Sequence, residues 1–479
     1  MNYYDFLKSK EIRSEASGFD VDKTTLSSGL YEWQRDIVRW ALKKGRACLF
    51  EDCGLGKTYQ QLEFSQSVAN HCNGAVLIVA PLAVAVQTVN EGRKFGFDVN
   101  LCRTKEDMKQ GINITNYEMI HKFDGNICGI VLDESSILKN HDGKTKMMII
   151  EKFKNVPYKL CCTATPAPND FVEIGNHAEF LGIMTQSEML STFFVHDGGN
   201  TSAWRLKGHA KDKFFEWVAS WACCLTSPED LGYDGLAYRL PDLILNEIIV
   251  QSDDLENSDG QMMLLPEMSM GLSERRAARN DSLEDRVKRA AEIVNASKEQ
   301  FLVWCDLNRE SEELTKAIND AVEVKGADSD EHKKNAMVSF SEGKIRVLVS
   351  KPKIAGWGMN WQNCHNVVFV GLSDSFESYY QAVRRCWRFG QTQQVNVYII
   401  ISEKEGAVKT NIERKQADAQ KMTAELIRYT KEILKQDIHS TVRMTDKYIA
   451  VETFKKPSWL RSGEHECKRS VDNRQSSAV

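Results

Sequence analysis

The stretch "EDCGLGKT" contains the residue types that bind phosphate in proteins. Gly54 and Gly56 allow the backbone to turn so that several N–H groups point inward, and Lys57 and Thr58 follow where a helix would begin. An ammonium group, a hydroxyl and clustered amides at this spacing suit a nucleotide triphosphate with Mg²⁺. The stretch therefore predicts a nucleotide loop.

The loop departs from the common pattern G-x-x-x-x-G-K-[ST], because Glu51 stands where that pattern has its first glycine. The segment before it, "GRACLFED", contains an apolar run of strand length, and the segment after it, "KTYQQLEFSQSVA", predicts a helix. Strand, glycine loop and helix is the order that a phosphate site requires. From this stretch alone, an ordinary strand-to-helix turn that contains GKT remains the alternative.

Two adjacent carboxylates, Asp133 and Glu134, end another predicted strand in "GIVLDESSILKN". An NTPase needs one carboxylate for Mg²⁺, usually through water, and a second that orients or deprotonates the attacking water. A helix cap is the alternative use of such a pair. A further strand is followed by "TATPAP", where Thr163 and Thr165 would connect sites through hydrogen bonds or form a polar turn.

Two arginines in "QAVRRCWRFGQ" suit a triphosphate as well. If this stretch begins as a helix, Arg385 and Arg388 are three residues apart and project from nearly one face. Two guanidinium groups aimed at one point would neutralise charge on a transferred phosphoryl group. A solvated basic helix face is the alternative. Upstream, Gly356 and Gly358 in "AGWGMNWQ" form a flexible turn that would bring backbone close to phosphate.

The elements that must position these residues occur in two series. Apolar runs of strand length alternate with helix-forming segments, first through "ACLFED", "AVLIVAP", "GIVLDES" and "YKLCCTATP", then through "FLVWCD", "IRVLVSK", "NVVFVG" and "VNVYIIIS". Each series predicts a parallel sheet with helices on both faces, so the fold class is α/β. Residues 171–240 break this rhythm with aromatic, partly basic and helix-forming sequence, which predicts an accessory insertion.

Composition limits the class of protein. The 479 residues are 42% hydrophobic and 27% charged, which is ordinary for a globular chain of about two to four domains. The formal net charge of −5 excludes a protein coated in positive charge, but a local track of Lys and Arg would still bind nucleic acid. Thirteen cysteines without a C-x-x-C pair favour reduced thiols over structural zinc.

Targeting signals are not evident. The apolar stretch "GAVLIVAPLAVAVQTVN" is too short for a membrane span and contains Pro81, and the N-terminal "MNYYDFLKSKEIRSE" lacks the apolar core of a signal peptide. We therefore expect a cytoplasmic protein without a membrane partner.

Taken in order, the motifs resemble those of superfamily 2 helicases and translocases, and more closely the Swi/Snf-like branch. They are "LYEWQRD", "EDCGLGKT", "DESSILKN", "TATPAPND", "GWGMN" and "QAVRRCWRFGQ", and the match spans about residues 28–400. The nucleotide loop of that branch commonly reads D-E-M-G-L-G-K-T, which accounts for the missing first glycine. Four residues depart from the usual pattern: Ser135, Ser136, Trp357 and Arg384, the last of which stands where an acid is common.

The resemblance implies two RecA-like (P-loop NTPase) domains that close on ATP and Mg²⁺. The ATP-binding residues it implies are Gln34, at the adenine, the loop residues Gly54, Leu55, Gly56, Lys57 and Thr58, and Gly358 at the edge of the second domain. The catalytic residues it implies are Lys57, Asp133, Glu134, Arg385 and Arg388, with Thr58 and Asp133 at the Mg²⁺, partly through water.

The expected domains are a first RecA-like domain at 1–170, the accessory helical region at 171–240, a second RecA-like domain with the arginine fingers at 241–445, and a polar tail at 446–479. The short chain resembles compact members of viral or bacterial (phage-type) origin, which predicts the cytoplasm of a bacterial or phage-infected cell.

The implied function is an ATP-dependent DNA helicase or translocase that acts in replication, recombination or repair. Its DNA contacts would be mainly to phosphate and largely independent of sequence, on double-stranded or branched DNA. The alternatives are an ATP-gated DNA clamp that recruits other proteins, and an RNA helicase. We expect a monomer, with replication or repair proteins as possible partners.

Overall fold

The computed structural model describes most of the chain as two α/β lobes. The described residues are 14–139, 143–197, 200–250, 282–355, 359–403 and 406–439. We call residues 14–240 the first lobe and residues 241–403 the second lobe. The predicted polar tail at 446–479 and the predicted site residue Gly358 lie outside the described residues. No helix within the described ranges is both long and apolar enough to cross a membrane.

The first lobe contains a seven-stranded parallel sheet with the strand order β3-β4-β2-β5-β6-β1-β9. Its strands are β1 (Arg46–Glu51), β2 (Ala75–Ala80), β3 (Val99–Leu101), β4 (Gly111–Asn116), β5 (Gly129–Asp133), β6 (Tyr158–Cys162) and β9 (Ala222–Leu225). The four strands predicted for the first series are all present. Because the sheet is parallel, β1, β5 and β6 end at one edge, which brings the nucleotide loop and the carboxylate pair together.

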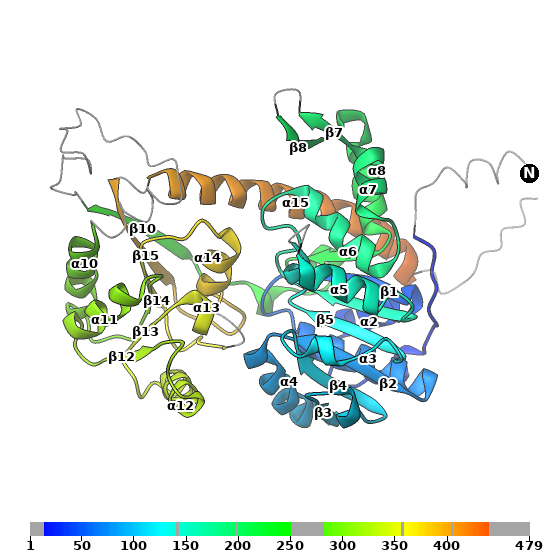
Figure 1. The fold of residues 1–479 in the computed structure, drawn as a ribbon, viewed down its shortest axis with the longest axis horizontal. Helices are drawn as coiled ribbons and strands as arrows, with labels where there is room; N and C mark the ends of the chain where they lie inside the picture. The colour runs from blue at the N-terminus through cyan, green and yellow to red at the C-terminus, as the bar shows by residue number, and fades with distance from the viewer. Residues whose placement is uncertain are drawn as a thin grey trace, which may run out of the picture. The chain divides into compact units, whose positions relative to one another are not determined.

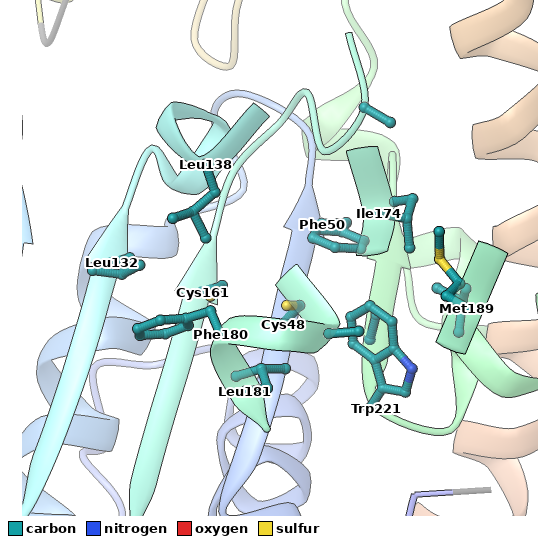
Figure 2. Close-up of a cluster of buried hydrophobic side chains, with 14 of the residues drawn as sticks. Cys48, Phe50, Leu132, Leu138, Cys161, Ile174, Phe180, Leu181, Met189 and Trp221 are labelled. Carbon is teal, nitrogen blue, oxygen red and sulfur yellow. The ribbon is translucent and has the colours of Figure 1, made fainter. Parts of the chain in front are cut away.

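Helices cover both faces of this sheet, as Figure 1 shows for α4 and α5 on opposite sides. The helices are α2 (Glu32–Lys44), α3 (Lys57–Cys72), α4 (Leu82–Phe95), α5 (Lys144–Lys152), α6 (Ile174–Leu181), α7 (Gln186–Phe193) and α8 (Lys211–Ala219). Successive residues of one strand point to opposite faces. Cys48 and Phe50 of β1 therefore pack with α6 and Trp221 (Figure 2), whereas Ala47 and Leu49 pack with α2 and α3.

The region expected to be an accessory insertion, residues 171–240, contributes to the first sheet itself. After α7, an antiparallel hairpin of β7 (Phe194–Asp197) and β8 (Asn200–Leu206) leads to α8, and β9 then pairs with β1. The sheet of the first lobe therefore extends past residue 170, the expected end of its domain. The "ACCL" run of β9 is only four residues long, which is why its pairing is hard to read from sequence.

The second lobe has a six-stranded parallel sheet with the strand order β10-β15-β14-β11-β13-β12. Its strands are β10 (Leu243–Val250), β11 (Phe301–Trp304), β12 (Ala321–Val324), β13 (Val347–Ser350), β14 (Asn366–Val370) and β15 (Val395–Ser402). Helices α10 (Leu283–Asn295) and α11 (Asn308–Ala317) cover one face, and α12 (Asp330–Ser341), α13 (Pro352–Ala355) and α14 (Phe376–Val383) belong to the other (Figure 1). Two parallel-sheet lobes confirm the predicted α/β fold class.

A long final helix, α15 (Gly406–His439), follows β15 and has contacts in both lobes. At its start, Val408 and Ile412 belong to the core of the second lobe. Farther along, the Tyr429 hydroxyl donates to Asp212 Oδ1 at 2.7 Å, and Thr430 Oγ1 accepts from the backbone N–H of Cys224 at 3.4 Å. The chain thus joins the lobes twice, once through residues 226–242 and once through α15.

Candidate functional site

The nucleotide loop lies between β1 and α3, as predicted. Gly54 (φ +90°) and Gly56 (φ +79°) adopt conformations that favour glycine, and Gly56 is the residue that precedes α3. The Lys57 ammonium donates to the backbone oxygens of Glu51 at 2.7 Å and Asp52 at 2.9 Å. The ammonium therefore lies over the turn, where a phosphate-binding lysine is needed, and Thr58 is the second residue of the helix.

Gln34, predicted to contact adenine, holds the same loop. Its side-chain oxygen accepts from the Tyr31 backbone N–H at 3.0 Å, and its Nε2 donates to the Leu55 backbone oxygen at 2.9 Å. The side chain is buried. The structure thus places Gln34 against the nucleotide loop, and its contact with the base stays a prediction.

The carboxylate pair follows β5 directly. Asp133 Oδ1 accepts from Gln61 Nε2 at 2.8 Å and from the Glu134 backbone N–H at 3.1 Å. The buried Tyr117 hydroxyl donates to the Asp133 backbone oxygen at 2.7 Å. Glu134 has φ +52°, which is uncommon for a side-chain-bearing residue and is found at functional turns. Gln61 and Tyr117, which the sequence did not single out, therefore fix the orientation of the pair.

Burial changes the protonation of both acids. Burial raises the pKa of Asp133, against the hydrogen bond from Gln61 and the Lys57 charge. Burial and the nearby Asp133 charge raise the pKa of Glu134 to about 7, although the charges of Lys57 and Arg385 oppose the shift. A carboxyl with a pKa near neutrality suits general-base chemistry. The opposing charges of Lys57 and Arg385 also show that groups from both lobes act on Glu134.

The stretch "QAVRRCWRFGQ" begins as a helix, but this helix ends before the two arginines. Helix α14 ends at Val383, and Arg385 and Arg388 lie in the turns that follow. The physical reason is that the Arg385 backbone oxygen accepts from the Trp361 N–H at 3.0 Å instead of from a following helical turn. Both guanidinium groups nevertheless converge, because each donates to the Met359 backbone oxygen, at 3.2 Å and 3.4 Å respectively.

The side chains of the two arginines are largely buried. Burial lowers the pKa of Arg385, and burial together with the Arg385 charge lowers the pKa of Arg388 to about 10. Within the described part of the chain, their Nε atoms and Glu134 Oε2 are buried without a hydrogen-bond partner. Unpaired buried polar atoms are costly, so a carboxylate and two guanidinium groups in this state fit a site that a bound anion and its cation would complete.

Further contacts join the two lobes. Glu377 of α14 pairs with Lys139 of the first lobe and accepts from Thr165 Oγ1 at 3.4 Å. The Thr165 backbone N–H in turn donates to Thr163 Oγ1 at 3.1 Å. Thr165 thus contacts the second lobe through a glutamate that the sequence did not reveal, and the predicted link of these threonines between an ATP site and a nucleic-acid site stays a prediction.

Arg384, which departs from the family pattern, also reaches across to the first lobe. Its Nη2 lies 2.6 Å from Asp52 Oδ2 and 2.9 Å from the Cys53 backbone oxygen. The loop and the arginine motif also touch directly, because a Cβ added to Gly54 would lie 2.9 Å from Phe389 Cβ. Arg384 could be noticed in the sequence as an unusual residue, but its partner could not.

The residues present fit ATP with Mg²⁺. The loop supplies an ammonium and a turn that favours glycine, Asp133 supplies an oriented carboxylate oxygen, and the arginines supply buried cations. Hard oxygen ligands of this kind suit Mg²⁺, with waters completing the shell. Gly358 lies outside the described residues, so its predicted place at the cleft remains a prediction.

Comparisons with known proteins agree with this geometry. Residues 33–194 match the SNF2-related domain, and residues 285–390 match the helicase conserved C-terminal domain. These segments contain the predicted site residues of the first and second lobes respectively. The chain is thus an ATP-hydrolysing enzyme with the two domains found in Swi/Snf-like members of superfamily 2.

Similar proteins include the SWI/SNF-related matrix-associated actin-dependent regulator of chromatin subfamily A-like protein 1 of Xenopus tropicalis. It is 24% identical over 444 residues, which covers 83% of this chain and 45% of the relative. The chain therefore spans less than half the length of that relative. The ATP-dependent DNA helicase DDM1 of Arabidopsis thaliana is 27% identical over 195 residues, covering 34% of this chain and 25% of that protein.

Among solved structures, the SWI2/SNF2 ATPase core of Sulfolobus solfataricus in complex with dsDNA aligns with 88% of this chain and 99% of that chain. The sequence identity is 18% and the TM-score is 0.41.

Proposed function

We propose that this enzyme is a DNA-dependent ATPase that moves along double-stranded or branched DNA. The observation that carries the proposal is the convergence of charge on one carboxylate: the charges of Lys57 from the first lobe and Arg385 from the second both act on Glu134. A site divided between two lobes is completed only when they approach, so any ligand that favours approach also favours hydrolysis.

Each residue has a distinct part in the proposed reaction. Lys57 neutralises charge on the β- and γ-phosphates, and the loop N–H groups orient them. Thr58 and Asp133 would hold Mg²⁺, which would supply positive charge against the phosphates. Asp133, fixed by Gln61, provides the carboxylate oxygen for that ion. Glu134 accepts the proton of the attacking water, and Arg385 and Arg388 stabilise the charge on the transferred phosphoryl group.

Movement follows from the proposed cycle of closure and opening. In this cycle, DNA binds across both lobes, ATP binding draws the lobes together, and product release lets them separate. Each cycle therefore changes the contacts that each lobe makes with the DNA. The "APLAV" and "TNYE" segments of the first lobe are our candidates for the phosphate contacts. Two similar proteins are named as a chromatin regulator and a DNA helicase, which supports DNA as the track.

The cellular setting is part of the proposal. We infer a compact protein of viral or bacterial type, cytoplasmic and monomeric, which serves replication, recombination or repair together with proteins of those processes. The matches to an SNF2-related domain and a helicase conserved C-terminal domain support the part of this proposal that concerns DNA.

One experiment separates a motor from an ATP-gated clamp. The full chain is given ATP and either a triplex, whose third strand a moving protein displaces, or a forked duplex, which a helicase unwinds. Triplex displacement without unwinding identifies a double-strand translocase, and unwinding identifies a helicase. ATP turnover stimulated by duplex DNA, with neither displacement nor unwinding, would instead identify the clamp. Stimulation by RNA but not DNA would reject the DNA track.

A further inference from the structure

Helix α14 and the turn after it present a row of polar side chains to the first lobe. Glu377, Tyr380 and Arg384 are spaced three and four residues apart, as neighbours on one helix face are. Glu377 contacts Lys139 and Thr165, whereas the other two side chains converge on Asp52. One face of the second lobe therefore contacts the first lobe at two places, and one of these is the nucleotide loop.

Asp52 uses both carboxylate oxygens in this contact. Arg384 Nη2 donates to Asp52 Oδ2 at 2.6 Å, and the Tyr380 hydroxyl donates to Oδ1. Oδ1 also accepts from the backbone N–H of Cys53 at 2.7 Å, which holds the turn of the loop itself. The carboxylate that shapes the loop is thus the same group that the second lobe holds.

The contact is well shielded from water. The side chain of Arg384 is 4% exposed and that of Asp52 is 18% exposed. The Arg384 guanidinium carbon lies 4.9 Å from the ring centre of Trp387 and 5.8 Å from that of Tyr380. Burial opposes the charge on Arg384, but Asp52, Tyr380 and Cys53 together outweigh it, so the pKa of Arg384 is raised. Removing one partner of such a pair leaves the other charge buried and uncompensated.

Sequence position connects this pair to the reacting groups. Asp52 is adjacent to Glu51, and the backbone oxygens of both residues accept from the Lys57 ammonium. Arg384 is adjacent to Arg385, whose charge acts on Glu134. A displacement of Asp52 therefore acts on the Lys57 ammonium through one hydrogen bond, and a displacement of Arg384 acts on Arg385 through one peptide unit.

We propose that Asp52 and Arg384, assisted by Tyr380, are positioning residues that couple the nucleotide loop to the arginine turn of the second lobe. The pair aligns Lys57 with Arg385 and Arg388 when the lobes approach, and it transmits a change in the loop to the second lobe. The catalytic part of this inference rests on the proposed function, whereas the mechanical coupling does not.

The test is a double-mutant cycle in the full chain with Asp52→Asn, Arg384→Gln and the combined variant. The Asp52→Asn substitution keeps an amide oxygen for the Cys53 N–H and removes the charge, so the loop turn is preserved. We expect each single variant to lower kcat for ATP on the order of tenfold, with less change in KM, and the combined variant to lower it by little more than either one. Arg384→Lys, which keeps the charge, should restore part of the loss.

Hydrogen exchange supplies a readout that does not need ATP turnover. Arg384→Gln should speed amide exchange in the loop peptide spanning 49–57, and Asp52→Asn should speed it in the peptide spanning 376–388, each on the order of tenfold. A matched control is the exposed pair Arg289 and Glu292, 2.8 Å apart on α10, where Arg289→Gln should change exchange only near the substitution.

Faster amide exchange in the lobe opposite each substitution would support the coupling. Faster exchange only in the lobe that carries the substitution, in both variants, would overturn it. Multiplicative losses in kcat, with no interaction between the two substitutions, would also overturn the positioning role. If the variants showed the reciprocal exchange but the wild type had no ATP turnover at all, the proposed function would fail while the mechanical coupling stood. A variant that unfolds, as judged by its thermal transition, is replaced by Arg384→Lys in both measurements.

Discussion

Gly56 and Gln34 are in such close contact that no side chain fits between them: a Cβ added to Gly56 would lie 2.5 Å from Gln34 Nε2. The glutamine amide is held on both sides, by Tyr31 and by Leu55, so it has little freedom to withdraw. The second glycine of the loop is thus required for two reasons, its positive φ and the adjacent amide.

The first prediction tests whether the loop requires glycine at position 56. Gly56→Ala should weaken binding of a fluorescent ATP analogue by at least about tenfold, because it combines backbone strain with a steric clash. Gly96→Ala is the matched control, because Gly96 has nearly the same φ, +82°, and nothing within 4 Å of an added Cβ. Titration of both variants checks this. Equal affinity in the two would show that nucleotide binding does not require glycine at position 56.

The second prediction concerns Lys57. Its ammonium donates to two backbone oxygens of the loop. Lys57→Ala should therefore abolish most ATP turnover, a loss on the order of a hundredfold or more, while the thermal transition shifts by only a few degrees. Steady-state turnover and calorimetry on the same preparation provide the check. Near-normal turnover would reject the nucleotide-loop assignment.

The third prediction concerns Glu134 and pH. Since a general base must be ionised and the pKa of Glu134 is raised to about 7, kcat/KM for ATP should rise with pH through about 7 and level off above it. Glu134→Gln should bind ATP and hydrolyse it very slowly, because Asp133 is retained. Rate profiles between about pH 5.5 and 9, with single-turnover assays of the variant, decide the matter. Rapid single-turnover hydrolysis by the variant would remove Glu134 from the base role.

The fourth prediction distinguishes the two arginines. Arg388→Ala should retain most ATP affinity but lower turnover on the order of a thousandfold, and stimulation by duplex DNA should vanish because closure would no longer complete the site. Turnover with and without DNA, beside nucleotide binding, tests this. If DNA-stimulated turnover persists in Arg388→Ala, the finger role passes to Arg385, whose charge is the one that acts on Glu134.

The fifth prediction concerns stability. Glu51 is fully buried, and burial raises its pKa to about 7 against the Lys57 charge and the hydrogen bond from Gln60. The folded state then binds the Glu51 proton more tightly than the unfolded state does. The contribution of Glu51 to the free energy of unfolding is therefore fully present below about pH 4.5 and is lost as the pH rises through 7. Glu51→Gln should thus have little effect at pH 5 and stabilise the protein at pH 8, by up to about 3 kcal/mol.

Thermal unfolding of the wild type and Glu51→Gln at both pH values checks the fifth prediction. Glu118→Gln, which changes an exposed glutamate, is the control and should show no such pH dependence. A Glu51→Gln variant that is equally destabilised at both pH values would mean that the carboxylate is needed in its ionised form.

Much of the fold was predictable because strands buried on both faces are nearly continuous apolar runs, as in Gly129–Asp133. The nucleotide loop and the carboxylate pair were predictable because their chemistry is local in sequence. The contact between Arg384 and Asp52 was not, since the two residues are 332 positions apart and only tertiary structure brings them together. The end of α14 before the arginines was not evident from the sequence for a similar reason, because the Trp361 N–H donates to the Arg385 carbonyl only in the folded chain.

Helix α15 has a consequence for the kinematics of the molecule. A lobe that is attached to another by one flexible segment can rotate about any axis, but a second attachment prevents most of these rotations. At a rise of 1.5 Å per residue, the 34 residues of α15 form a strut of about 50 Å that begins in the core of the second lobe and ends against α8 and β9 of the first. The segment at 226–242 and this strut are two separate connections between the lobes, and together they restrict the relative motion of the lobes to rotation about nearly one axis. Energy released by ATP hydrolysis is therefore directed into that rotation.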